Sequence, residues 1–204
     1  MSDIRLGPDP TGLHRIAYGQ DGYFTSRQAR GCGFSVQLLA YHVRSGRYER
    51  VRRGLYRLRD YPGSSHEEVR AKWLAVGSDR AVVSHESALE LHGLSDVLPN
   101  RLHLLVRRSD RGLKPPDGVS LHTTTEPLDP SEVVTREGIR VTAPARSLID
   151  AAGAGTAPEQ IELAVRQAIE QGLVTRRSLL ARAERRGGRV AGLARRALQE
   201  PQRS

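Results

Sequence analysis

The stretch from Tyr23 to Leu58 constrains the fold more than any other part of the chain. Thr25, a residue type that caps helix N-termini, precedes a short helix-favouring run that ends at Gly31-Cys32-Gly33. Ser35 is a second capping residue and begins another helical run, which ends before Gly46. Two helices joined by a tight, glycine-containing turn are the pattern of a helix-turn-helix.

Two β-rich segments follow this pair of helices. Tyr48–Arg52 and Leu55–Leu58 flank Arg53-Gly54, an arrangement that is typical of two strands joined by a tight turn. Apolar residues at helical spacing between Leu13 and Tyr18 predict one more helix before the pair. We therefore expect a winged helix-turn-helix over residues 11–60, with the two strands forming the wing.

The same stretch is strongly basic. Residues 44–59 contain seven arginines and a single acid, Glu49. Residues 1–60 carry 11 basic and 5 acidic side chains (net +6), residues 61–174 carry 12 and 16 (net −4), and residues 175–204 carry 9 and 2 (net +7). Basic clusters attract polyanions, chiefly nucleic acids.

Arginine richness also has a simpler explanation. Lys72 and Lys114 are the only lysines, and such a preference for arginine is typical of a GC-rich genome. The C-terminal basic cluster is equally well explained as the solvated face of a helix. The N-terminal cluster differs from it because it coincides with a DNA-binding fold pattern.

The second helix of the pair has a polar face suited to the major groove. At about 100° per residue, Leu39 and Val43 face the core with Val36 beside them, and the opposite face carries an amide, a phenol and a guanidinium. Such groups can contact base edges, the helix N-terminus can bind a phosphate, and the wing arginines can contact the flanking backbone. The predicted DNA-binding residues are Arg27, Ser35, Val36, Gln37, Ala40, Tyr41, Arg44, Arg50, Arg52 and Arg53.

A turn-rich segment at residues 60–65 predicts a domain boundary. Residues 66–200 then combine helical and β-rich segments and become entirely helical from Pro158 onward. The expected fold class is α+β, with a winged helix-turn-helix followed by a small mixed α/β domain that ends in helices. The expected second-domain elements are a helix over His66–Val76 and strands over Arg101–Arg107, Val119–Thr125 and Gly138–Thr142.

Motifs for catalysis or metal binding are missing. Gly153-Ala154-Gly155 lacks a third glycine at dinucleotide-binding spacing, and His85-Glu86 lacks the second histidine of a zinc-protease helix. The seven histidines show no ligand spacing, although His103 and His122 lie on predicted strands and could pair across a sheet. Cys32, the single cysteine, has no histidine near it in sequence to activate it. We expect no enzymatic activity, no metal and no cofactor.

No apolar run approaches the roughly 18 residues of a membrane-spanning helix. The polar N-terminus also lacks the apolar core of a signal peptide. The sequence therefore predicts a cytoplasmic protein without a membrane partner.

Two further segments, taken together with the winged stretch, resemble a known family. They are Ala81–Leu89 (AVVSHESAL) and Gly138–Asp150 (GIRVTAPARSLID). In this order and at this separation they resemble AbiEi-type antitoxins of type IV toxin–antitoxin systems, over roughly residues 12–198. The resemblance implies a winged domain that binds inverted repeats near its own promoter in double-stranded DNA and represses the operon. It also implies a C-terminal domain that opposes a nucleotidyltransferase-like toxin, in many members without a stable complex.

Four residues of these segments match the family pattern and are the predicted antitoxin residues. A structural interpretation stands beside this one: a helix cap, helix packing, and an i,i+4 salt bridge worth about 0.3–0.5 kcal/mol. We expect a DNA-binding repressor that acts as an antitoxin. The alternative is a stand-alone DNA-binding regulator or a protein-interaction module with no toxin partner. The four residues are Ser84, Glu86, Arg146 and Asp150.

Overall fold

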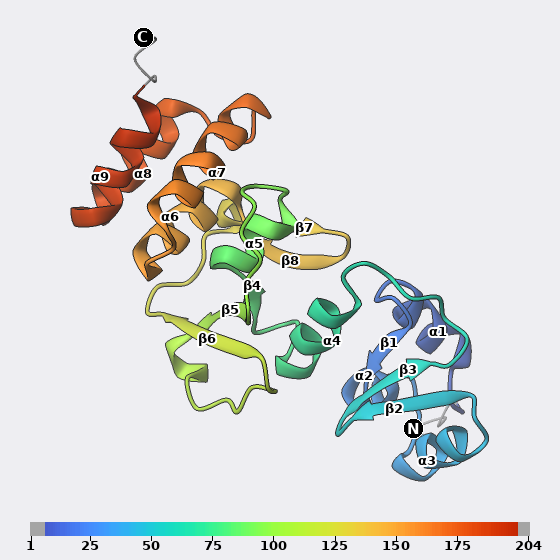
Figure 1. The fold of residues 1–204 in the computed structure, drawn as a ribbon. Coiled ribbons are helices and arrows are strands. Elements are labelled where there is room, and N and C mark those ends of the chain that lie inside the picture. The colour runs from blue at the N-terminus through green and yellow to red at the C-terminus, as the bar shows by residue number, and fades with distance from the viewer. Residues whose placement is uncertain (1–6, 200–204) are drawn as a thin grey trace. The chain divides into compact units, whose positions relative to one another are not determined.

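The computed structural model describes residues 7–199 and divides the chain into two compact units, residues 1–77 and 78–204 (Figure 1). Both units combine helices with a sheet, so the expected α+β class is confirmed. Among residues 7–199, no helix has the length and apolar character needed to cross a membrane.

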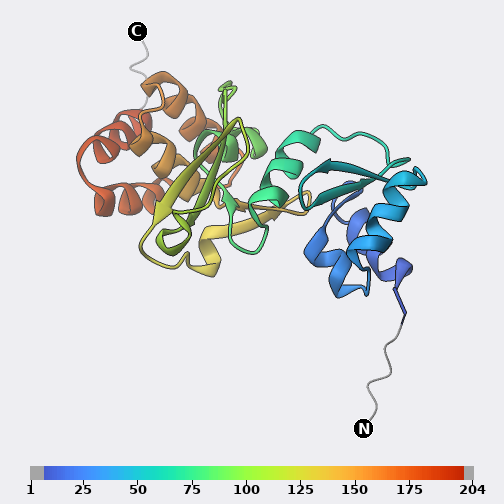
Figure 2. The same ribbon diagram turned by 90° about the horizontal axis from the view of Figure 1, so that it is seen from below.

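The N-terminal unit contains the expected helix-turn-helix and wing. Figure 2 shows its helices α1 to α3, in blue, gathered beside the strands. The strands form an antiparallel sheet in the order β1-β3-β2. The elements are α1 (Pro10–Tyr18), β1 (Tyr23–Thr25), α2 (Ser26–Gly31), α3 (Val36–Arg44), β2 (Tyr48–Arg52), β3 (Leu55–Leu58) and α4 (Glu67–Val76).

Local capping fixes where the two central helices begin. The Thr25 hydroxyl accepts a hydrogen bond from the Gln28 backbone N–H (3.2 Å), and the Gln28 side chain accepts one from the Thr25 N–H (2.8 Å). At α3, the Ser35 hydroxyl accepts from the Leu38 N–H at 3.1 Å. Each cap satisfies a backbone donor that the first helical turn leaves unpaired. Both predicted caps are confirmed.

An aromatic cluster forms much of the core of this unit. Tyr48 is 1% exposed, and the ring centroid of Phe24 lies 5.0 Å away in an edge-to-face arrangement. Phe24 also stacks on Tyr56, with centroids 5.6 Å apart. These rings come from β1, β2 and β3, and they form one cluster with buried residues of the helices. The wing is therefore part of the core. The remaining buried core residues are Leu13, Ala17, Ala29, Phe34, Leu39 and Leu58.

Helix α4 packs on β1 and β3 and belongs to the N-terminal unit. The Arg70 guanidinium, 2% exposed, pairs with the Asp21 carboxylate, and Glu67 accepts a hydrogen bond from the Tyr23 hydroxyl at 2.7 Å. The turn-rich residues 60–65 before this segment predict that it belongs to the second domain. In the structure those residues connect two elements of the same unit.

The second unit is built on a mixed five-stranded sheet in the order β6-β5-β4-β8-β7. The β5–β6 and β4–β8 pairs are parallel, and the β4–β5 and β7–β8 pairs are antiparallel. The strands are β4 (Val82–Val83), β5 (Leu102–Arg107), β6 (Val119–Thr124), β7 (Val133–Arg136) and β8 (Ile139–Thr142).

Helices of the second unit pack against this sheet. Figures 1 and 2 both show the orange and red helices α6 to α9 packed together on one side of it. Their shared core includes Leu148, Ile161, Leu179 and Leu193, all nearly inaccessible to solvent. The helices are α5 (His85–Leu91), α6 (Pro144–Ala154), α7 (Pro158–Glu170), α8 (Arg176–Arg186) and α9 (Gly188–Leu198), with short 3-10 turns η1 (Arg108–Asp110) and η2 (Pro130–Glu132).

The sequence pattern does not predict strand β7. It pairs with β8 through a two-residue loop, Glu137-Gly138, in which both residues have positive φ (48° and 77°). Two consecutive positive φ angles are the geometry of a type I′ hairpin turn. Glutamate is an unusual residue at the first of these positions, and the turn was therefore not recognised.

Candidate nucleic-acid interface and second-unit pockets

The outward face of α3 carries the polar side chains that the sequence predicted. Gln37, Tyr41 and Arg44 are exposed, with Tyr41 at 56%, and their spacing of four and three residues keeps them on one helical face. Leu39 is buried against the core. Val36 was expected beside the inward face, and this was wrong: it is 71% exposed, because the first turn of α3 projects beyond the core.

The wing exposes three arginine side chains to solvent. Arg50, Arg52 and Arg53 are exposed, and the backbone of β2 changes register against β3 between Arg50 and Arg52. A β-bulge of this kind interrupts the inward and outward alternation of a strand. Residues 49–52 are consequently all exposed, so the tip of the wing offers guanidinium groups to a partner.

The wing is held in position by its turn. Gly54 has φ of +80°, in the left-handed region that favours glycine. Its carbonyl accepts a hydrogen bond from the backbone N–H of Ser26, at 2.9 Å. The first residue of α2 is thus linked to the wing tip, and the neighbouring Arg27 is exposed.

Two arginines of the basic stretch have structural contacts instead. Arg57 donates to the Tyr61 carbonyl at 3.0 Å, lies 5.5 Å above the centre of the Tyr23 ring, and forms an ion pair with Glu67. Arg59 donates to the Gly46 carbonyl at 2.7 Å. The arginine excess therefore divides into side chains that hold the wing and side chains that point to solvent. Of the ten predicted DNA-binding residues, Ala40 is partly buried and the other nine are exposed.

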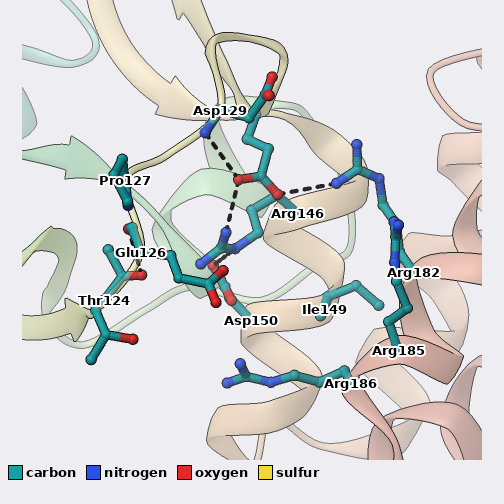
Figure 3. A pocket seen from close by; sticks show the side chains of 12 residues that line it. Thr124, Glu126, Pro127, Asp129, Arg146, Ile149, Asp150, Arg182, Arg185 and Arg186 are labelled. Carbon is teal, nitrogen blue, oxygen red and sulfur yellow. Dashed lines mark hydrogen bonds and ion pairs between the residues drawn. The ribbon is translucent and has the colours of Figure 1, made fainter.

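The predicted antitoxin residues Arg146 and Asp150 lie in a polar pocket of about 540 Å³ in the second unit (Figure 3). The Arg146 guanidinium donates to Asp150 at 2.7 Å and to Glu132 at 3.1 Å, and Arg182 donates to the same Glu132 at 3.1 Å. Asp150 is only 5% exposed, so the pair is not the surface salt bridge that its i,i+4 spacing suggested. In Figure 3 the Arg186 side chain extends along the same pocket.

Burial and charge act in opposite directions on Asp150. Removal from water raises the pKa of its carboxyl, and the neighbouring Arg146 lowers it; burial is the larger effect, so the pKa is raised overall. Glu132, from η2, holds two arginines of different helices, α6 and α8. The network therefore joins three elements, and the sequence analysis identified only one of its pairs.

Ser84 and Glu86 have contacts that the sequence did not indicate. Ser84 occupies the N-cap position of α5, but its hydroxyl makes no capping hydrogen bond. It lies 2.8 Å from Nδ1 of His85 instead, so Ser84 holds the predicted N-cap position without the capping hydrogen bond. Glu86 accepts a hydrogen bond from the Thr156 hydroxyl at 2.7 Å, which ties α5 to the end of α6.

The structure also gathers three histidines that are far apart in the sequence. His85, His103 and His122 each place a ring nitrogen within 4.8 Å of the others. Burial, together with the neighbouring histidines, lowers the pKa of His85 to about 3. Sequence spacing gave no indication of this cluster beyond the possibility that His103 and His122 pair across a sheet. Cys32, in the other unit, is partly buried, and burial raises the pKa of its thiol, as expected for a packing residue.

Comparison with known proteins supports the two-part organisation. Residues 15–59 match a family model described as a transcriptional regulator, AbiEi antitoxin. Residues 81–200, more than half of the chain, match the AbiEi antitoxin C-terminal domain. Both descriptions are of a regulator or an antitoxin, and neither names an enzymatic activity.

A comparison with solved structures finds a protein of similar fold. The crystal structure of the RV2827C protein from Mycobacterium tuberculosis is similar, with a TM-score of 0.56 and 17% sequence identity, over 94% of this chain and 78% of that chain. At this level of identity the likeness concerns the fold alone. A search of curated proteins finds no match. The two family matches, in the order and at the positions of the two units, show that the chain belongs to the AbiEi antitoxin family.

Proposed function

We propose that the protein is a sequence-specific transcriptional repressor that acts, in the cytoplasm, as the antitoxin of a type IV toxin–antitoxin operon. It binds inverted repeats in its own promoter through the N-terminal unit and counteracts a nucleotidyltransferase-like toxin through the second unit. The observation that supports DNA binding best is the exposed polar face of α3 beside an exposed, arginine-rich wing.

The two parts of this surface have different chemistry. Gln37 and Arg44 can each make two hydrogen bonds to one base edge, and a good bidentate contact contributes about 1–3 kcal/mol of base discrimination. Arg50, Arg52 and Arg53 lie on the wing beside α3, and we assign them to backbone phosphates next to the groove that α3 occupies. Phosphate contacts add affinity and salt dependence but carry no sequence information.

The test measures binding of a fluorescent duplex from the chain's own upstream region over about 50–200 mM salt. Replacing the three wing arginines by alanine is expected to reduce the slope of log affinity against log salt by about 2.7, because each phosphate contact contributes about 0.9. The variant Gln37→Ala should leave that slope unchanged and reduce the preference for the promoter over a scrambled duplex.

A matched control removes the same charge from the second unit. Arg166, Arg177 and Arg189 are exposed arginines of α7, α8 and α9, and their joint replacement by alanine should leave DNA affinity unchanged. If this variant loses affinity and the wing variant does not, the helices of the second unit bind DNA and the wing proposal is wrong. Binding that is insensitive to salt would also refute it.

The toxin proposal rests on the match of the second unit to the antitoxin C-terminal domain. The test is co-expression with the product of the adjacent gene, if that gene encodes a nucleotidyltransferase-like protein. Growth rescue that persists in the wing variant would separate antitoxin activity from repression. Promoter binding without rescue would favour the alternative, a stand-alone DNA-binding regulator.

A further inference from the structure

The histidine cluster is separate from the proposed DNA-binding surface and lies in the second unit. It consists of His85, the first residue of α5, His103 on β5 and His122 on β6. We propose that this cluster binds one divalent transition-metal ion, with Zn²⁺ as the expected ion, through one ring nitrogen of each histidine. The proposal does not depend on DNA binding or on a toxin partner.

The distances suit a small metal ion. Nδ1 of His103 lies 3.0 Å from Nε2 of His122, and the ligand atoms of all three residues lie within 4.8 Å of one another. Tetrahedral zinc with Zn–N bonds of about 2.0–2.1 Å separates its ligands by about 3.3 Å. The His103 and His122 nitrogens are thus already near that separation. The His85 ring stacks on His122 with centroids 3.6 Å apart, and it must rotate out of this stack for its nitrogen to point at the shared ion.

The sheet brings these residues together. β5 and β6 are parallel, and His122 pairs in register with Leu105, two residues beyond His103, so the two rings are diagonal neighbours on one face. The third ring comes from the start of α5, which directly follows the adjacent strand β4: the backbone N–H of Ser84 donates to the His103 carbonyl at 3.0 Å, and His85 is the next residue. Three different elements therefore converge on one point.

The backbone at His85 is strained. Its φ is +55°, in the left-handed region that non-glycine residues adopt at a cost of about 1–3 kcal/mol. Such strain is found preferentially at functional sites. The Ser84 hydroxyl lies 2.8 Å from Nδ1 of His85. If Nδ1 donates to that hydroxyl, Nε2 retains its lone pair for a metal ion, which is the usual role of an outer partner of a ligating histidine.

The surroundings favour neutral ligands and leave one coordination position open. All three rings are at least partly buried, and the neutral imidazole is the form of histidine that ligates a metal ion. A pocket of about 360 Å³, lined by His85 and His122, gives access for water as a fourth ligand. The positive charges of Arg146 and Arg186 disfavour a bound cation there, and the negative charge of Asp150 partly compensates for them. Nitrogen ligands select zinc, nickel, cobalt or copper over magnesium and calcium.

The test uses the full chain without an affinity tag, stripped of metal by a chelator and titrated calorimetrically with Zn²⁺. We expect saturable binding of one ion per chain, a rise in the melting temperature, and no binding of Mg²⁺. His103→Gln and His122→Gln should each weaken Zn²⁺ binding by at least about tenfold, the smallest effect seen when even an outer partner is lost. His66→Gln, in the other unit, is the control and should bind as the wild type does.

A second measurement uses only the wild-type chain, so the proposal can still be tested if a histidine variant fails to fold. Co²⁺ bound to the wild-type chain should give the visible absorption of a tetrahedral site, and Zn²⁺ should displace it. Absence of saturable Zn²⁺ and Co²⁺ binding by the wild type would overturn the proposal. Equal Zn²⁺ affinity in folded His103→Gln, His122→Gln and wild-type chains would overturn it as well.

Discussion

Replacing Arg146 by methionine distinguishes a buried ion pair from a surface one. The spacing of Arg146 and Asp150 predicts an exposed helical pair, whose loss would cost about 0.3–0.5 kcal/mol. In the structure Asp150 is 5% exposed and Arg146 is 20% exposed. Removing one partner of a buried pair leaves an uncompensated charge and costs about 3–5 kcal/mol. Since the pocket admits water and Arg186 is close, we expect the lower end, about 3 kcal/mol.

The effect should depend on pH in a defined direction. Burial holds the pKa of Asp150 above its ordinary value, and loss of the arginine raises it further. As the pH falls, the folded carboxyl therefore takes up a proton before the unfolded one does, and the buried charge disappears. The deficit of Arg146→Met relative to wild type should be largest at neutral pH and shrink steadily toward about pH 4.

Urea unfolding followed by far-ultraviolet circular dichroism measures this deficit. Fluorescence of Trp73, the only tryptophan, reports on the N-terminal unit and serves as an internal reference. Arg182→Met is the matched control: Glu132 keeps its contact with Arg146, so the cost should stay below about 1 kcal/mol. A double variant, Arg146→Met with Asp150→Leu, should be more stable than Arg146→Met alone.

A cost of less than about 0.5 kcal/mol for Arg146→Met at neutral pH, the value expected of an exposed pair, would show that the ion pair is not buried in its effect on stability. A deficit that does not change with pH would show that the loss comes from packing of the arginine stem and not from the Asp150 charge.

Three further predictions concern other parts of the molecule. His92 is 6% exposed, its Nε2 donates to the Thr142 carbonyl at 2.8 Å, and burial lowers its pKa. Below about pH 6.5 this histidine is protonated in the unfolded chain but not in the folded chain. The free energy of unfolding therefore falls by up to about 1.4 kcal/mol for each unit by which the pH is lowered. In urea unfolding, the His92→Gln variant should lose less stability than the wild type when the pH is lowered from about 7 to 5.5. Equal losses in the two proteins would show that His92 does not cause the pH dependence. Gly54→Ala should lower the stability measured by thermal unfolding by about 1–2 kcal/mol, because Gly54 has a positive φ. Gly31→Ala is the control and should leave stability unchanged, because Gly31 has no positive φ and no atom close to an added Cβ. Leu39→Ala should cost about 2–5 kcal/mol, and Leu98→Ala, at an 80% exposed position, should change stability by less than about 0.5 kcal/mol.

The winged helix-turn-helix could be predicted from the sequence because its determinants are local. Thr25 and Ser35 fix the helix starts through hydrogen bonds to residues three positions away. The strand bounds Tyr48–Arg52 and Leu55–Leu58 were predicted without error, because a glycine turn and β-rich composition act over a few residues. The outward face of α3 follows from helical periodicity alone.

Other features depend on contacts between distant residues, and the sequence could not supply them. Periodicity shows which face a side chain occupies but not which neighbour lies opposite. Arg57 and Arg50 look alike in the basic stretch, yet only Arg57 meets the Tyr61 carbonyl and Glu67. Asp150 of α6 is 5% exposed and shares its pocket with Arg182 and Arg186 of α8, a neighbourhood that the sequence does not indicate.

The histidine cluster shows this division most clearly. His103 and His122 were assigned to strands from composition, and the sequence by itself determined that both could lie in a sheet. Only the tertiary structure decided that β5 and β6 are parallel neighbours, in a register that places the two rings on one face. His85 joins them because β4 pairs with β5 and the chain turns sharply at a positive φ. Strand order and register are set by packing of the whole sheet, and no spacing along the chain encodes them.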